Sequence, residues 1–146
     1  MINLTPSSIP DDKTLRDILS NAKTIAVVGH SDKPFRTSYQ IAQFLRSVGY
    51  RVYPVNPAVV EIDGQSSYPT LKDLPEAIDL VNVFRRSEYL NEVVEEAILT
   101  NAKTIWAQLG VRDRQAAQNA IDAGLNIVMD TCIKVEYLRL KINSSS

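Results

Sequence analysis

Apolar residues gather in five short runs along the chain, separated by longer segments with helical periodicity. The runs are rich in Val, Ile and Leu and lack a period of two, which is typical of strands covered on both faces of a parallel sheet. They are Thr24–Val28, Arg51–Val55, Asp79–Val83, Lys103–Ala107 and Leu125–Met129. Their starts are 27, 28, 24 and 22 residues apart, about the length of chain that a crossover and a strand need.

The segments between the runs carry apolar residues at the three- and four-residue spacing of amphipathic helices. They predict helices over Thr14–Leu19, Ser38–Val48, Glu88–Thr100 and Asp113–Asp122, with Ser87 as the N-cap of the third. Two segments are less regular. Asn56–Pro75 contains three prolines and predicts a long loop with at most a short helix near Leu71–Leu74, and Thr131–Leu140 predicts a final turn or helix.

This alternation predicts an α/β fold, a Rossmann-like doubly wound sheet of five parallel strands with helices on both faces. Counting the five runs along the chain, we expect the strand order 3-2-1-4-5. The switch point would then lie between the first and fourth strands, and ligands bind at the carboxyl ends of strands at such a point. With 146 residues, we expect a single domain over 1–146, with its core at about 14–140 and a flexible tail from Asn143.

Composition narrows the classes of function. Sixteen basic and 17 acidic residues give a net charge of −1, whereas surfaces that bind nucleic acid or anionic membranes are basic. One cysteine and one histidine, Cys132 and His30, exclude an intrachain disulfide and metal sites rich in either residue. Met1–Pro10 lacks the charged and apolar regions of a signal peptide, and no apolar run approaches the ~20 residues of a membrane span. We therefore expect a cytoplasmic protein without a nucleic-acid or membrane partner.

The loop after the first strand has the properties of a phosphate-binding loop. Gly29 permits a tight turn and a close approach of the backbone, although it could serve the turn alone. Free N–H groups at the start of the following helix favour an anion. Hydroxyl and cationic side chains add donors and positive charge, in Ser31, Lys33, Arg36, Thr37 and Ser38. The G-x-G-x-x-G fingerprint of dinucleotide sites lacks its second and third glycines, and no acidic residue ends the second run, which argues against NAD.

Polar residues follow the other strands as well. After the second strand, Asn56–Pro57 can contact a base edge or simply form a turn. After the third strand, Arg85 and Arg86 stand at the start of a helix, where the helix dipole disfavours cations unless an anion is bound. Solvated arginines paired with surface acids are the alternative. After the fourth strand, Gln108 and Gly110 are expected to face the crevice.

Taken together, the residues at the strand ends resemble the stand-alone CoA-binding domain proteins, which are similar to the N-terminal domain of the succinyl-CoA synthetase alpha subunit. The resemblance covers Thr14 to Tyr137 and rests on motifs at all five strand ends. They are Gly29–Ser31 with Lys33–Pro34 and Ser38, then Tyr53–Pro57, Val83–Arg86, Trp106–Val111 and Met129–Glu136. Two positions depart from the family pattern, because many members have a histidine at the position of Tyr137, and a small hydrophobic residue or another side chain is common at the position of His30.

The resemblance implies a coenzyme A site built from these motifs. The first loop would hold the CoA diphosphate, through Gly29, His30, Ser31 and Lys33, with Pro34 and Ser38 in the same motif. The adenosine would lie near Asn56 and Pro57. The phosphates or the pantetheine arm would be faced by Phe84, Arg85 and Arg86, and the expected site is completed by Gln108, Gly110 and Cys132.

We therefore expect binding of coenzyme A or an acyl-CoA, without a catalytic centre evident in the sequence. His30 is expected to donate a hydrogen bond to a phosphate, and Cys132 is either a structural thiol or lies close enough to the CoA thiol to form a mixed disulfide. Two alternatives stay open, an accessory subunit of an acyl-CoA ligase or transferase and an NAD(P)- or nucleotide-binding module. The sequence also allows a homodimer or a partner protein, without locating an interface.

Overall fold

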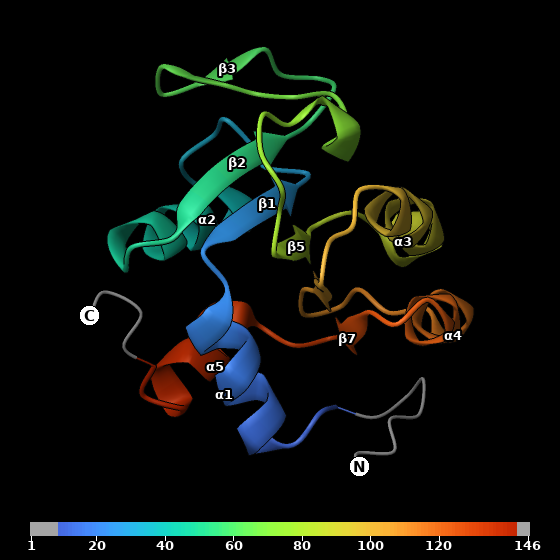
Figure 1. Cartoon of the computed structure of the whole chain (residues 1–146). Helices are drawn as coiled ribbons and strands as arrows, with labels where there is room; N and C mark the ends of the chain where they lie inside the picture. The colour runs from blue at the N-terminus through green and yellow to red at the C-terminus, as the bar shows by residue number, and fades with distance from the viewer. Residues whose placement is uncertain (1–8, 143–146) are drawn as a thin grey trace.

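The computed structural model describes residues 9–142, which form a parallel sheet between two layers of helices (Figure 1). The five predicted strands are confirmed, as β1 (Thr24–Val28), β2 (Arg51–Val55), β5 (Leu80–Val83), β6 (Thr104–Ala107) and β7 (Asn126–Val128). All four pairings between them are parallel. The predicted C-terminal tail at 143–146 and the first eight residues lie outside the described range.

The strand order differs from the one we expected. The observed order is β2-β1-β5-β6-β7, so the third predicted strand lies beside the first instead of outside the second. Pro54 gives the physical reason, because proline cannot donate a hydrogen bond to a neighbouring strand and is confined to sheet edges. The Pro54 carbonyl faces away from β1 and accepts from the Tyr68 amide at 3.0 Å. β2 is therefore an edge strand, and the order 3-2-1-4-5 would have placed it inside the sheet.

This order moves the switch point to the gap between β1 and β5. The chain leaves β1 through α2 (Thr37–Ser47) toward β2, whereas it leaves β5 through α3 (Leu90–Leu99) toward β6. Val28 and Val83 pair at the carboxyl ends of the two strands, and the Phe84 amide donates to the Val28 carbonyl at 2.8 Å. The expected switch point between the first and fourth strands is wrong, and the residues after β1 and β5 are the ones that meet.

The crossover from β2 to β5 passes over β1 largely without a helix, as the prolines predicted. It contains a 3₁₀ turn, η1 (Leu71–Asp73), where a short helix was expected. It also contains a small antiparallel hairpin that we did not predict, formed by β3 (Glu61–Ile62) and β4 (Gln65–Ser66). The hairpin has a sequence signal, because Asp63-Gly64 is a favoured two-residue turn and both residues have positive φ.

All the predicted helices are present, and Thr131–Leu140 contains α5 (Ile133–Arg139). The others are α1 (Asp12–Asn21), α2, α3 and α4 (Arg114–Asp122). Asp113 caps α4 by accepting from the Gln115 and Ala116 amides. Ser87 is not the N-cap of α3, because it begins a 3₁₀ turn, η2 (Ser87–Tyr89), and its hydroxyl accepts from the Arg112 amide at 2.9 Å.

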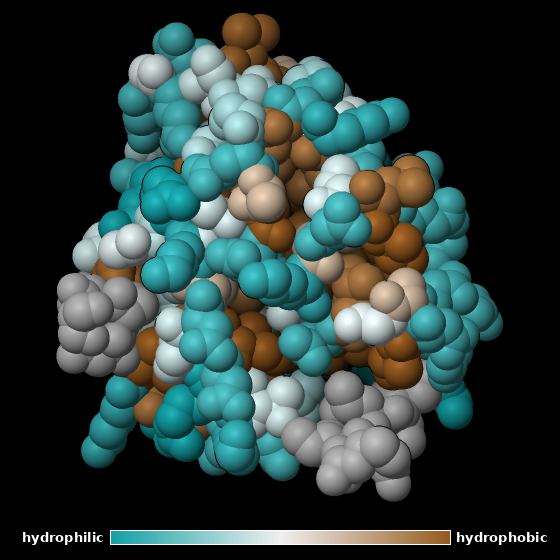
Figure 2. Space-filling view, viewed as in Figure 1, coloured by the Kyte–Doolittle hydropathy of each residue, from teal (hydrophilic) through white to brown (hydrophobic). Residues whose placement is uncertain are grey.

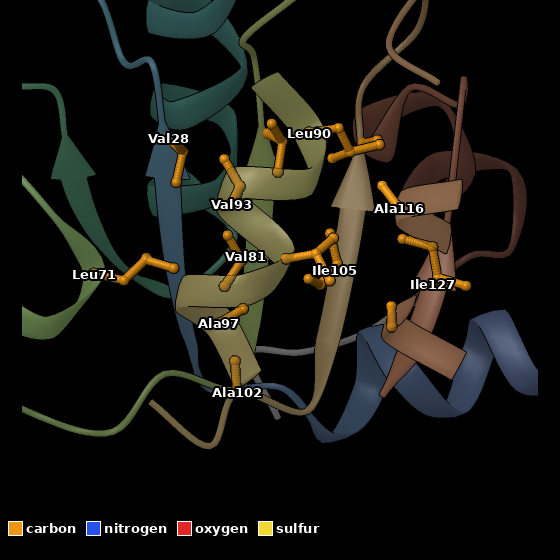
Figure 3. Close-up of a cluster of buried hydrophobic side chains, with 14 of the residues drawn as sticks. Val28, Leu71, Val81, Leu90, Val93, Ala97, Ala102, Ile105, Ala116 and Ile127 are labelled. Atoms are coloured by element: carbon orange, nitrogen blue, oxygen red, sulfur yellow. The ribbon is translucent and has the colours of Figure 1, made fainter. Parts of the chain in front are cut away.

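The helices bury the two faces of the sheet in two hydrophobic clusters. α3 and α4 cover one face, and Figure 3 shows Val93 and Ala97 of α3 lying over Val81 and Ile105 of the sheet. α1, α2 and α5 cover the other face, around the fully buried Trp106. Figure 2 shows mostly hydrophilic side chains on the visible surface, with hydrophobic atoms along the side of α3 and α4. Within residues 9–142, no helix has both the length and the apolar character needed to cross a membrane.

Candidate functional site

Gly29 occupies the switch point and is required there by its backbone. Its φ is +89°, and a Cβ atom at this position would lie 3.2 Å from the Phe84 carbonyl oxygen. Its amide donates to the Val55 carbonyl at 2.8 Å. Gly29 therefore makes the turn after β1 and also lets the ends of β1, β2 and β5 approach one another. Gly29 lines two clefts.

The first of these, here called the phosphate cleft, has a volume of about 390 Å³. It is lined by Gly29, Ser31, Lys33, Arg36, Thr37, Ser38 and Phe84. Its floor is the start of α2, where the Thr37, Ser38 and Tyr39 amides find no acceptor within residues 9–142. Neither Lys33 nor Arg36 has a carboxylate within 4 Å in the same range. Free amides and unpaired cations make this cleft electropositive.

Side-chain hydrogen bonds fix the course of the loop above the phosphate cleft. The Ser38 hydroxyl accepts from the Ser31 amide at 2.9 Å, and the Ser31 hydroxyl accepts from the Lys33 amide at 3.0 Å. Asn56 Nδ2 donates to the His30 carbonyl at 2.9 Å, while Asn56 Oδ1 accepts from the Ala58 amide at 2.9 Å. Asn56 therefore supports the loop through its amide nitrogen and makes a turn through its amide oxygen.

His30 lies beneath this loop and not in the phosphate cleft. Its side chain has 0% exposure, with Nδ1 at 2.8 Å from the Ser31 carbonyl and Nε2 at 3.2 Å from Arg46 Nη2. Burial lowers the pKa of His30 to about 4, and the positive charge of Arg46 lowers it as well. The ring is therefore neutral at pH 7. Since both ring nitrogens have protein partners, the expected hydrogen bond from this side chain to a phosphate is not available.

The second cleft, here called the acidic cleft, has a volume of about 330 Å³. Its apolar part includes Val28, Val55 and Val93, with Pro57 and Pro69 at the crossover. α3 contributes three carboxylates to this cleft, those of Glu92, Glu95 and Glu96. The remaining lining residues are Gly29, Thr70 and Arg85. The glutamates were missed at the sequence level, although their spacing of three and four residues places them on one side of a helix.

Arg85, which was expected to face the phosphates or the pantetheine arm, lines the acidic cleft, whereas Arg86 lines neither cleft. The Arg85 guanidinium lies 4.3 Å from the centre of the Tyr89 ring and 3.7 Å from the Glu92 carboxylate. Arg86 is exposed and lies 3.7 Å from Glu88, which is the surface pairing that we kept as an alternative. Pro34 is exposed beside the loop and lines neither cleft.

The residues after β6 and β7 are also absent from both clefts. Gln108 is buried, and its Oε1 accepts from Asn82 Nδ2 at 3.4 Å and from the Ile133 amide at 3.3 Å. Gly110 lies in an exposed turn, and its amide donates to Asp130 at 2.7 Å. Cys132 packs against the core at the start of α5. Because β5 lies between β1 and β6, these loops lie one strand spacing, about 4.8 Å, further from the loop after β1 than the expected strand order placed them.

Comparison with known proteins identifies the family. The family model of the CoA binding domain matches residues 23–138. The uncharacterized protein YneT of Bacillus subtilis is 42% identical over 128 residues, which cover 88% of this chain and 95% of that one. A hypothetical protein from Pyrococcus horikoshii OT3 has a TM-score of 0.89 at 38% identity, and the match covers 97% of this chain and 99% of that one.

A more distant relative is part of an enzyme. The alpha subunit of the ADP-forming acetate–CoA ligase I of Pyrococcus furiosus is 26% identical over 145 residues, covering 88% of this chain. The match spans only 31% of that subunit, so this chain corresponds to about a third of it. The resemblance found in the strand-end motifs is confirmed by the family match: the chain belongs to the CoA-binding domain family.

Proposed function

We propose that this protein binds coenzyme A or an acyl-CoA across Gly29, with the diphosphate in the phosphate cleft. The observation that carries the proposal is the start of α2, where three amides lack acceptors within residues 9–142 and two neighbouring cations lack carboxylate partners. A helix N-terminus of this kind favours an anion through its amides and its dipole. The Ser31 and Ser38 hydroxyls hold the loop in place, so little ordering is left for the ligand to induce.

The adenosine of the ligand would occupy the acidic cleft. Pro57 and Pro69 present flat apolar surfaces, and Arg85 offers a planar guanidinium for stacking. The free ribose hydroxyl and the adenine amine are hydrogen-bond donors, and the Glu92 and Glu95 carboxylates are acceptors. The pantetheine arm would leave the phosphate cleft past Phe84, on the side of β5. This assignment agrees with the place of Pro57 in the family motif, which implies that the adenosine lies near Asn56 and Pro57.

The proposal concerns binding by this chain. A second candidate function, a CoA-binding component of an acyl-CoA ligase that needs another chain, is favoured by the relation to about a third of a ligase alpha subunit. The two candidates share the same CoA site. They differ in whether a partner chain confers activity that the isolated protein lacks, which an assay of acyl-CoA formation with and without that partner measures.

The CoA site is tested by calorimetric titration of the purified protein with CoA, and with NAD at matched concentration. We expect CoA to bind and NAD to bind much more weakly, since the second and third glycines and the acid of the dinucleotide fingerprint are absent. Arg36→Ala should weaken CoA binding about tenfold, as expected for loss of a charge-assisted contact. Arg16→Ala on α1 is the matched control, because it removes the same exposed charge away from both clefts. No binding of CoA, or equal affinity for CoA and NAD, would contradict the proposal.

A further inference from the structure

The buried imidazole beneath the phosphate loop has one defined tautomer. Arginine can only donate, so His30 Nε2, which is 3.2 Å from Arg46 Nη2, must be the acceptor. The proton of the neutral ring is then on Nδ1, and this N–H donates to the Ser31 carbonyl at 2.8 Å. Arg46 is itself held at 2.9 Å by Gln65 Oε1 of β4, and Gln65 Nε2 donates to the Val52 carbonyl at 2.7 Å. The direction of the Nδ1 hydrogen bond is therefore set by groups on α2, β4 and β2.

This hydrogen bond determines which way one peptide unit of the loop faces. The peptide bonds of the described residues are trans, and the carbonyl and N–H of a trans peptide point in opposite directions. With the Ser31 carbonyl held against the buried His30 ring, the Asp32 N–H points away from that ring, between Ser31 and Lys33, which line the phosphate cleft. That N–H has no acceptor among residues 9–142. The preceding peptide unit is fixed as well, by Asn56 on the His30 carbonyl and Ser38 on the Ser31 amide.

We propose that His30 is a positioning residue, which holds the Ser31–Asp32 peptide so that the Asp32 amide donates to the diphosphate of the bound ligand. The inference rests on the proposed function and adds to it a residue that touches no ligand atom. The His30 ring is uncharged at pH 7, so the positive charge beside the phosphates comes from Lys33 and Arg36 and not from His30.

Two substitutions separate positioning from simple packing. His30→Asn keeps an N–H donor near the Nδ1 position and should retain the Ser31 hydrogen bond. His30→Leu fills a similar volume without any donor. We expect the CoA dissociation constant, measured by calorimetry, to rise about tenfold in His30→Leu and to stay within about threefold of wild type in His30→Asn. Thermal unfolding of both variants reports stability separately, and a purely structural role predicts that affinity follows stability, not the presence of the donor.

Amide NMR of the wild-type protein gives a second readout that needs no variant. On saturation with CoA, the Asp32 ¹H resonance should move downfield, as for an amide that gains a charged acceptor. Wild-type affinity in His30→Leu, equal losses in both variants, or an unmoved Asp32 amide in the CoA complex would overturn the inference while leaving CoA binding intact. If His30→Leu does not fold, His30→Asn and the Asp32 resonance decide the question. Failure of the wild-type protein to bind CoA would instead refute the proposed function and the inference with it.

Discussion

The buried His30 ring makes the stability of this protein depend on pH in a calculable way. Its pKa falls from 6.5 to about 4 on folding, so between these values the unfolded chain holds one proton that the folded chain does not. Stability is therefore fully present above pH 6.5, falls as the pH is lowered toward 4, and changes no further below it. From pH 7 to pH 5 the expected loss from this residue is about 2 kcal/mol, which is the proton-linkage integral over that interval.

Denaturant unfolding at several pH values measures this loss, and the single tryptophan, Trp106, is a convenient probe because it is fully buried. The comparison is between wild type and His30→Asn, which cannot titrate. Carboxylates whose pKa is lowered by folding, such as Glu76 beside Arg51 and Asp79 beside the Lys23 and Thr24 amides, titrate in both proteins and cancel. Parallel curves of unfolding free energy against pH for the two proteins would refute the reasoning, since His30 would then titrate normally in the folded state.

Three further predictions concern the ligand site. Gly29→Ala should cost about 1–3 kcal/mol of stability in chemical unfolding and abolish CoA binding in calorimetry, because φ is +89° and the new Cβ would press on Phe84; unchanged affinity would show that the close approach is not needed. Arg85→Ala and Lys33→Ala should each weaken CoA binding, with a larger effect at 0.01 M than at 0.5 M salt, where screening shortens the range of the charge; an effect independent of salt would exclude a charge contribution. Incubation with CoA disulfide should add no CoA mass to the intact protein, because Cys132 lies outside both clefts; an adduct that Cys132→Ser abolishes would place this thiol at the ligand.

The positions of the strands and of the phosphate loop could be predicted from the sequence because they depend on local patterns. Runs of apolar residues define the strands, and a glycine followed by hydroxyl and basic residues defines the loop. The strand order depends on long-range pairing, and the local signal for it is Pro54, which marks β2 as an edge strand. The predicted strand order placed the loop after β6 next to the loop after β1, whereas β5 lies between the two strands in the structure.

The hydrogen-bond partners of individual polar side chains were harder to predict, because they too depend on long-range contacts. Asn56 and Gln108 sit after strands, where ligand contacts are common, and their residue types suit a ligand or a backbone partner equally. Which one they bind depends on groups 25 or 26 residues away along the chain, such as the His30 carbonyl and the Ile133 amide. His30 is a similar case, because its burial follows from the packing of α2 and the hairpin, which its own neighbours in the sequence do not reveal.

The edge strand β2 also limits how copies of this protein can associate. Exposed strand edges invite pairing with another chain through unpaired backbone groups. Here Pro54 has no N–H to offer, its carbonyl accepts from Tyr68, and the Val52 carbonyl accepts from Gln65. At the opposite edge β7 has only three residues. A dimer formed by extending the sheet from one copy into the next is thus disfavoured at β2 and limited to three residues at β7, so we expect any self-association to use helices or loops.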